Sequence, residues 1–71
     1  MMTREEHLEW CKQRARVYIE AGDLANAVAS MASDMKKHPE CGVNEFLIAA
    51  GMIHVMNYDE REVRRWVEGF R

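Results

Sequence analysis

The chain has 71 residues, 48% of them hydrophobic and 31% charged, and a formal net charge of −2. This length and balance are typical of one small globular domain and argue against a disordered chain. The slight acidic excess argues against a dedicated nucleic-acid-binding domain, which usually carries a clear basic excess. No stretch reaches the ~18 consecutive apolar residues of a membrane span, and the opening MMTREEH is unlike a secretory signal. We therefore expect a cytoplasmic protein.

The first expected helix covers residues 4–21. Thr3 and Glu6 form the T-x-x-E pattern of a capping box at its start. Gly22 ends it, because glycine adopts the left-handed backbone conformation at little cost. Spacings of three and four residues predict a buried stripe of Leu8, Cys11, Ala15 and Tyr18, flanked by Trp10, Val17 and Ala21.

The second expected helix covers residues 24–37 and begins directly after Asp23, which can cap it. Its predicted buried stripe consists of Leu24, Ala27, Val28, Met31 and Met35. Residues 36–38 place positive charge in the last turn, where it complements the helix dipole, and Pro39 prevents continuation. The short elbow between the two helices predicts an antiparallel pair.

The third expected helix covers residues 45–56, with Asn44 as its cap. It is apolar nearly all round, with Phe46, Leu47, Ile48, Ala49, Ala50, Met52, Ile53, Val55 and Met56 on all its sides. Such a helix is expected to be buried on several sides, either by the other helices or by a second copy of the chain. Gly51 weakens the helix, and we expect close approach of a neighbouring backbone or a bulky ring as compensation.

The fourth expected helix covers residues 60–69, where Asp59 and Glu62 repeat the capping-box pattern. Its apolar face carries Val63, Trp66, Val67 and Phe70, and its other side is basic through Arg61, Arg64, Arg65 and Arg71. The alternation typical of strands is absent from the sequence. The predicted fold is all-α: a small four-helix domain over residues 1–71, built from two antiparallel helical hairpins.

The first hairpin, residues 3–39, resembles a single tetratricopeptide repeat. The residues that carry the resemblance are Ala15, Tyr18, Gly22, Asp23, Ala27 and Pro39, with Met31 as the bulky contact of the second helix. The resemblance implies that the two helices cross closely at Ala15 and Ala27, while Tyr18 covers the junction. Asp34 departs from the family, which usually has a small residue there.

The second half of the chain matches the repeat pattern at only a few positions. Leu47 and Gly51 fit the pattern, whereas His54 replaces the aromatic residue and Tyr58 replaces the elbow glycine. Repeat arrays need about three units to bury a continuous core, so repeat-like packing is expected rather than a superhelical receptor. Residues 3–39, together with the ending VRRWVEGFR of residues 63–71, also resemble small uncharacterised helical proteins of tailed bacteriophages and prophages, a group that carries no catalytic motif to transfer.

Two pairs of residues have the chemistry of a zinc site: His7 with Cys11, and His38 with Cys41. Neither pair contains a CxxC knuckle, and Cys11 occupies the buried stripe. We therefore favour structural roles for all four residues and expect neither a metal nor another cofactor.

No enzyme motif is present in the sequence. His54 would need a carboxylate or nucleophile within hydrogen-bond reach to act as a base, and no pattern places Asp34 or Asp59 near it. We expect His54 in the core or an interface, hydrogen-bonded to a carbonyl. A phosphate-binding glycine loop, a nucleophile elbow and paired catalytic carboxylates are all missing from the sequence.

These features favour a non-enzymatic protein–protein interaction module that self-associates, with a phage accessory protein acting on a host protein as a second hypothesis. A nucleic-acid-binding domain that uses the arginines of the fourth helix is the alternative. The expected partner-binding residues are Met52, Met56, Arg61, Arg64, Arg65, Trp66 and Phe70. Each has a simpler role as well, because methionines fill gaps in small cores and the arginines are balanced by Glu60, Glu62 and Glu68.

Overall fold

The computed structural model describes residues 3–38 and 44–70. Within these ranges it holds four helices and no strand: α1 (Arg4–Glu20), α2 (Leu24–Met35), α3 (Glu45–Met56) and α4 (Glu60–Glu68). The all-helical prediction is confirmed, and each helix ends within two residues of its expected position. No helix in the described ranges has the length and apolar character to cross a bilayer.

Each helix begins at the residue expected to cap it. The Thr3 hydroxyl accepts from the Glu6 amide at 3.1 Å, and the Thr3 amide donates to the Glu6 carboxylate at 3.0 Å, which completes the capping box. The side chains of Asp23, Asn44 and Asp59 likewise each accept from the amide three residues further on. These local contacts explain why the helix starts were predictable.

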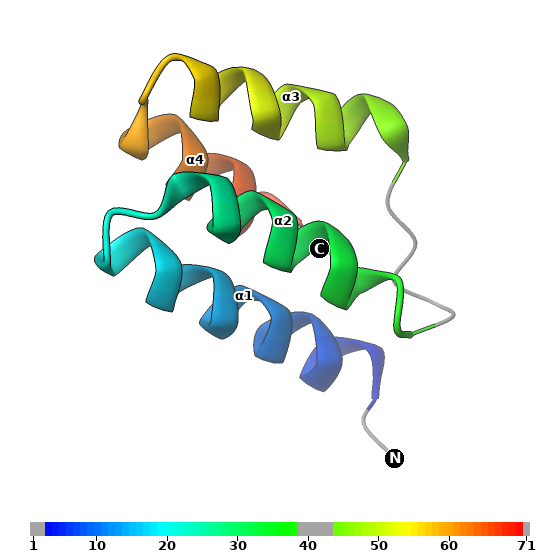
Figure 1. Cartoon of the computed structure of the whole chain (residues 1–71). Coiled ribbons are helices and arrows are strands. Elements are labelled where there is room, and N and C mark those ends of the chain that lie inside the picture. Colours follow the sequence, from blue (N-terminus) through cyan, green and yellow to red (C-terminus); the bar gives the residue numbers. More distant parts are fainter. Residues whose placement is uncertain (1–2, 39–43, 71) are drawn as a thin grey trace.

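The elbow between α1 and α2 is closed by a Schellman motif. The Gly22 amide donates to the Ile19 carbonyl at 2.9 Å, and the Asp23 amide donates to the Tyr18 carbonyl at 2.8 Å. Gly22 has a positive φ of 77°, where the absence of a Cβ removes the steric cost. α1 and α2 lie side by side along their lengths, with this elbow at one end (Figure 1).

The elbow between α3 and α4 has the same hydrogen bonds 36 residues later in the chain. The Tyr58 amide donates to the Val55 carbonyl, and the Asp59 amide donates to the His54 carbonyl, both at 3.0 Å. Tyr58 occupies the left-handed position with φ 51°, where glycine would be preferred. The two elbows are therefore alike in geometry although their sequences differ.

α2 ends at Met35, earlier than the expected residue 37. The Asp34 carbonyl would bond residue 38 in a continuing helix, but it accepts from the Lys37 amide at 3.1 Å and from His7 Nε2 at 2.7 Å. Residues 36–38 therefore follow the helix as a turn. Pro39 lies outside the described residues.

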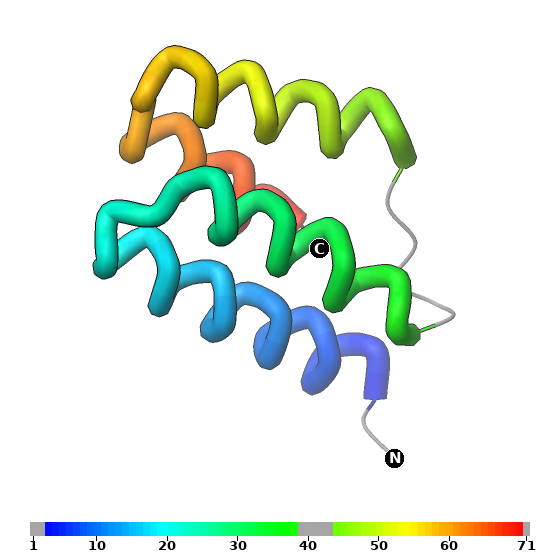
Figure 2. Tube along the Cα trace, viewed as in Figure 1, coloured from blue at the N-terminus to red at the C-terminus, as the bar shows by residue number. Residues whose placement is uncertain are grey.

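The core is built from α1, α2 and α4. Its buried apolar residues are Leu8, Cys11, Ala15, Ile19, Ala27, Val28, Met31, Met35, Val63 and Val67. α4 contacts the other three helices, whereas α1 and α3 do not touch each other. α3 lies along the outer side of α2 and α4, as the trace of the chain shows (Figure 2). Among the described residues of α3, Gly51 alone is buried.

Two predictions about α1 are corrected. Ile19 rather than Tyr18 completes the buried stripe, and Tyr18 packs half-buried at its edge. Val17, expected on the flanking line, is 67% exposed. The reason is the helical period: Val17 follows Leu8 by nine residues and points about 180° away from it.

Candidate functional site

The most apolar helix of the chain presents a continuous apolar stripe to solvent. Phe46, Ala49, Ile53 and Met56 follow one another at intervals of three, four and three residues, and all four are exposed. Phe46 is 87% exposed and Met56 is 76% exposed. We call these four residues the α3 face. Large apolar side chains that remain uncovered in this way are typical of interaction sites.

Gly51 holds α3 in this orientation from the opposite side of the helix. A Cβ at Gly51 would lie 2.8 Å from Cε2 of Trp66 and 3.0 Å from a methyl group of Val28. Only a residue without a side chain lets α3 approach α4 and α2 so closely. The expected bulky ring over Gly51 is therefore confirmed, and it is the indole of Trp66.

Trp66 is itself fixed by two neighbours. Its Nε1 donates to the Leu47 carbonyl at 2.7 Å, which links α4 to the first turns of α3. Its ring packs edge-on against Phe70, with 4.9 Å between the centroids. These contacts, together with the half-buried Val55, anchor one side of α3 and leave its far side uncovered.

The α3 face carries no charge. Glu45 is the only Asp, Glu, Lys or Arg of α3, and the next one along the chain is Asp59. Glu45 lies in the first turn, where a negative charge complements the helix dipole. An apolar, uncharged surface over three turns of helix is only weakly hydrated, so its burial against an apolar partner is favourable.

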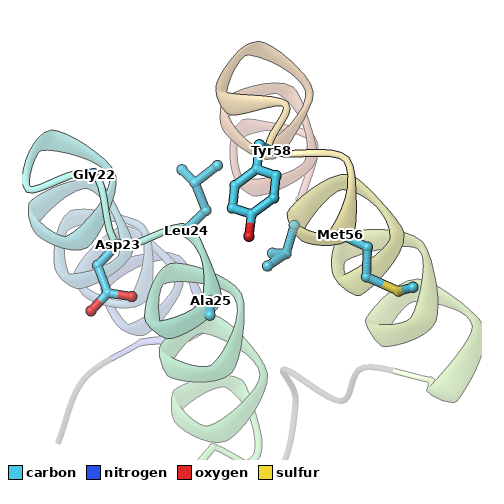
Figure 3. Close-up of a pocket in the computed structure, with 7 residues that line it drawn as sticks. Gly22, Asp23, Leu24, Ala25, Met56 and Tyr58 are labelled. Atoms are coloured by element: carbon cyan, nitrogen blue, oxygen red, sulfur yellow. The ribbon is translucent and has the colours of Figure 1, made fainter.

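A groove of about 340 Å³ adjoins the α3 face at the elbow end of the molecule. It is lined by Gly22, Asp23, Leu24, Ala25, Val55, Met56 and Tyr58. In Figure 3 the Tyr58 ring lies between Leu24 and Met56, over the gap between α2 and α3. Tyr58 is 89% exposed, and its backbone adopts the left-handed conformation. Met56 belongs to both surfaces and joins them.

The residues expected from the sequence to bind a partner do not form one surface. Met52 and Met56 lie on the exposed part of α3, whereas Trp66 and Phe70 are half-buried between α4 and the start of α3. Met31 and Met35, by contrast, fill the core. The four methionines within the described residues therefore divide between the interior and the exposed helix.

The arginines of α4 are engaged with carboxylates of the same chain. Arg64 lies 3.0 Å from Glu20 on α1 and 3.5 Å from Glu60, and the hydrogen bond with Glu20 raises the pKa of Arg64. Arg65 lies 3.2 Å from Glu62. Arg61 is exposed. These contacts place Arg64 and Arg65 in ion pairs on the surface.

Phe46, Ile53 and Tyr58 are exposed residues of this region that sequence reasoning did not single out as binding residues. The apolar character of the third helix was recognised, but a helix that is apolar all round gives no indication of which side is covered. The position of Gly51 was the available signal. Residues about 180° from a close-packed glycine point away from the neighbouring helix.

A second cluster surrounds Asp34 where α1 and α2 pack together, and it was not expected. Asp34 is only 2% exposed, yet its carboxylate accepts from Arg14 at 2.7 Å, Lys37 at 3.1 Å and Ser30 at 3.2 Å. Burial by itself would raise the pKa of Asp34, but the hydrogen bonds from Lys37, Arg14 and Ser30 outweigh it and hold that pKa below its usual value. Asp34 therefore stays ionised in the interior.

Trp10 covers the outer side of the Asp34 cluster. The Arg14 guanidinium lies 4.9 Å from the centre of its ring, and the Lys37 ammonium lies 5.7 Å away. Both cations thus contact the indole and the carboxylate of Asp34 together. The arrangement consists of satisfied contacts within the chain and supports the fold.

Part of the proposed zinc quartet comes together in the structure. The rings of His7 and His38 lie 5.2 Å apart, while Cys11 is fully buried and Cys41 lies outside the described residues. His7 Nε2 must carry the proton that it donates to the Asp34 carbonyl. No group of three or more His, Cys, Asp or Glu residues able to hold a metal exists within residues 3–38 and 44–70. His54 is half-buried on α3.

Comparisons with known proteins return nothing. No protein-family model matches the chain, and neither a curated protein nor a solved structure matches it. The function must therefore be inferred from the surfaces described above.

Proposed function

We propose that this chain is a non-enzymatic protein–protein interaction module that binds through the α3 face. The observation that carries the proposal is the exposure of α3: in the most apolar helix of the chain, Gly51 is the one buried residue, while Phe46, Ile53 and Met56 are exposed. Removing such a surface from water is the main source of affinity in protein association.

The packing of the two hairpins supports the same proposal. Both elbows use one hydrogen-bond pattern, 36 residues apart, and a buried small residue lies seven residues before each left-handed position: Ala15 in the first hairpin and Gly51 in the second. We take this as tetratricopeptide-like construction, a scaffold that presents helix faces to partners. A short array of such units leaves an outer helix uncovered.

The test compares two single substitutions of exposed apolar residues. Ile53→Lys places a charge in the middle of the α3 face, and Val17→Lys places the same charge on α1, which does not touch α3. Self-association is followed by sedimentation, and capture of bacterial proteins is followed by mass spectrometry. We expect Ile53→Lys to abolish binding and Val17→Lys to retain it. A wild-type chain that neither self-associates nor retains a protein that Ile53→Lys loses would overturn the proposal.

A phage accessory role, in which the partner is a host protein, rests on the sequence resemblance and on small size. It uses the same α3 face and is tested by the capture arm of the same experiment. The nucleic-acid alternative is weakened by the ion pairs of Arg64 and Arg65. It predicts DNA or RNA binding at low salt that falls steeply as salt rises.

A further inference from the structure

The α3 face has the same spacing in both directions along the helix. Phe46, Ala49, Ile53 and Met56 are separated by three, four and three residues, so the pattern is symmetric about the level of Gly51. We infer that the partner of this face is a second copy of the chain, packed antiparallel across a two-fold axis at that level. The inference rests on the proposed function and names its partner.

Such a pairing matches large side chains with complementary neighbours. Phe46 lies beside the partner's Met56, and Ala49 lies beside the partner's Ile53, with each contact made twice as a two-fold axis requires. Apolar residues at alternating intervals of three and four are typical of the contact line between two paired helices. A parallel pair would instead set Ala49 against the partner's Ala49 and leave a gap in the seam, where packed interiors leave none.

Charge favours the antiparallel direction as well. Glu45 is the only Asp or Glu of α3, and it lies at the start of the helix. An antiparallel pair separates the two copies of Glu45 by roughly 18 Å along the seam, since each residue advances 1.5 Å. A parallel pair would bring them together and would also align the two helix dipoles.

The exposed area fits a small and reversible interface. Phe46 in the first turn of α3 is 87% exposed and Tyr58 just after its last turn is 89% exposed, so these two residues leave roughly 300 Å² uncovered at the two ends of the helix. A short helix still offers less than the ~800 Å² per partner of a standard interface. We expect a dimer in exchange with monomers, populated at high micromolar concentration.

The antiparallel pair also gives Tyr58 a role. This residue keeps a left-handed backbone where glycine would cost less, and its ring is exposed at the end of the α3 face. Because positions 58 and 44 are symmetric about Gly51, the ring lies beside the start of the partner's α3. An aromatic side chain adds contact area there that glycine could not supply.

Oligomeric state is the first test. In sedimentation equilibrium the full chain is expected to dimerise, Ile53→Lys to weaken dimerisation at least about tenfold, and Val17→Lys to match the wild type. A wild-type chain that remains a monomer at high micromolar concentration overturns the inference. If that monomer still captures a protein that Ile53→Lys loses, the proposed function stands without the dimer; if it captures none, both fall.

Disulfide trapping tests the direction. Phe46→Cys and Met56→Cys are made in a Cys41→Ser chain, where the remaining Cys11 is fully buried. Mixing the two variants under oxidation is expected to yield a cross-linked heterodimer, because the antiparallel seam brings these positions together within disulfide range. Each variant alone is expected to yield little, since its own cysteines lie at opposite ends of the seam. Equal cross-linking of the single variants would overturn the antiparallel arrangement.

Discussion

The indole of Trp66 lies over Gly51 so closely that an added Cβ would fall 2.8 Å from its Cε2 atom. This contact decides where α3 sits. It draws the helix against α4 through a residue without a side chain and turns the α3 face outward. The position of α3 and the exposure of the candidate site therefore depend on this contact.

Gly51→Ala is expected to destabilise the protein by up to about 2 kcal/mol. Alanine is the better helix former by ~1 kcal/mol, but overpacking against a ring and a methyl group costs more, typically about 1–3 kcal/mol. Urea unfolding measures the difference. The matched control is the same substitution in a Trp66→Phe chain, where the smaller ring is expected to reduce the cost. A stabilising Gly51→Ala in the wild-type chain would contradict the close contact.

Asp34→Asn is expected to cost about 1–3 kcal/mol of unfolding free energy. The substitution keeps the shape of the side chain but replaces hydrogen bonds to charged partners with weaker ones in a buried position. The control is Asp23→Asn, which removes the same charge at an exposed helix cap where asparagine caps equally well. Equal and small effects at both positions would show that the Asp34 cluster contributes little.

Stability is expected to fall as the pH is lowered below about 4, near the ordinary pKa of an aspartate. The folded-state pKa of Asp34 lies below its unfolded value, so the unfolded chain binds the proton more readily. The stabilisation is complete above the unfolded pKa and is lost as the pH falls through the folded one. Glu68, whose pKa is lowered by its hydrogen bond with Arg16, acts in the same direction but is half-exposed.

Thermal unfolding between neutral pH and pH 2 measures this acid dependence. Asp34→Asn is expected to flatten the curve, because asparagine does not titrate. An unchanged slope in that variant would assign the acid sensitivity to other carboxylates.

Tyr58→Gly is expected to stabilise the monomer by about 1 kcal/mol, because glycine relieves the left-handed backbone at φ 51°. Chemical unfolding at low protein concentration measures it. Tyr58→Ala is the control: it removes the ring but keeps the strained Cβ, so no gain is expected. Both variants are expected to weaken dimerisation, since both lose the exposed ring. A Tyr58→Gly chain of unchanged stability would contradict the strain.

The sequence alone determined the four helices of the described residues and where each begins. Each helix is capped by a side chain that accepts a hydrogen bond from the amide three residues further on: Thr3, Asp23, Asn44 and Asp59. The spacing of apolar residues also predicts the buried side of α2 and α4. These are local interactions, so they can be derived without knowing what packs against what. The need for a ring or a backbone near Gly51 was also derivable, but not the identity of Trp66.

Only the tertiary structure decided which surfaces are covered. A helix that is apolar on every side has no periodic signal to orient it, so the exposure of Phe46 and Ile53 follows from the packing of Gly51 against Trp66 and Val28. Asp34 was unexpected in the core for a related reason. A buried carboxylate is stable only where hydrogen-bond donors surround it. Arg14 of α1 and Lys37 of the turn after α2 both donate to Asp34, and they meet there only because α1 and α2 pack together.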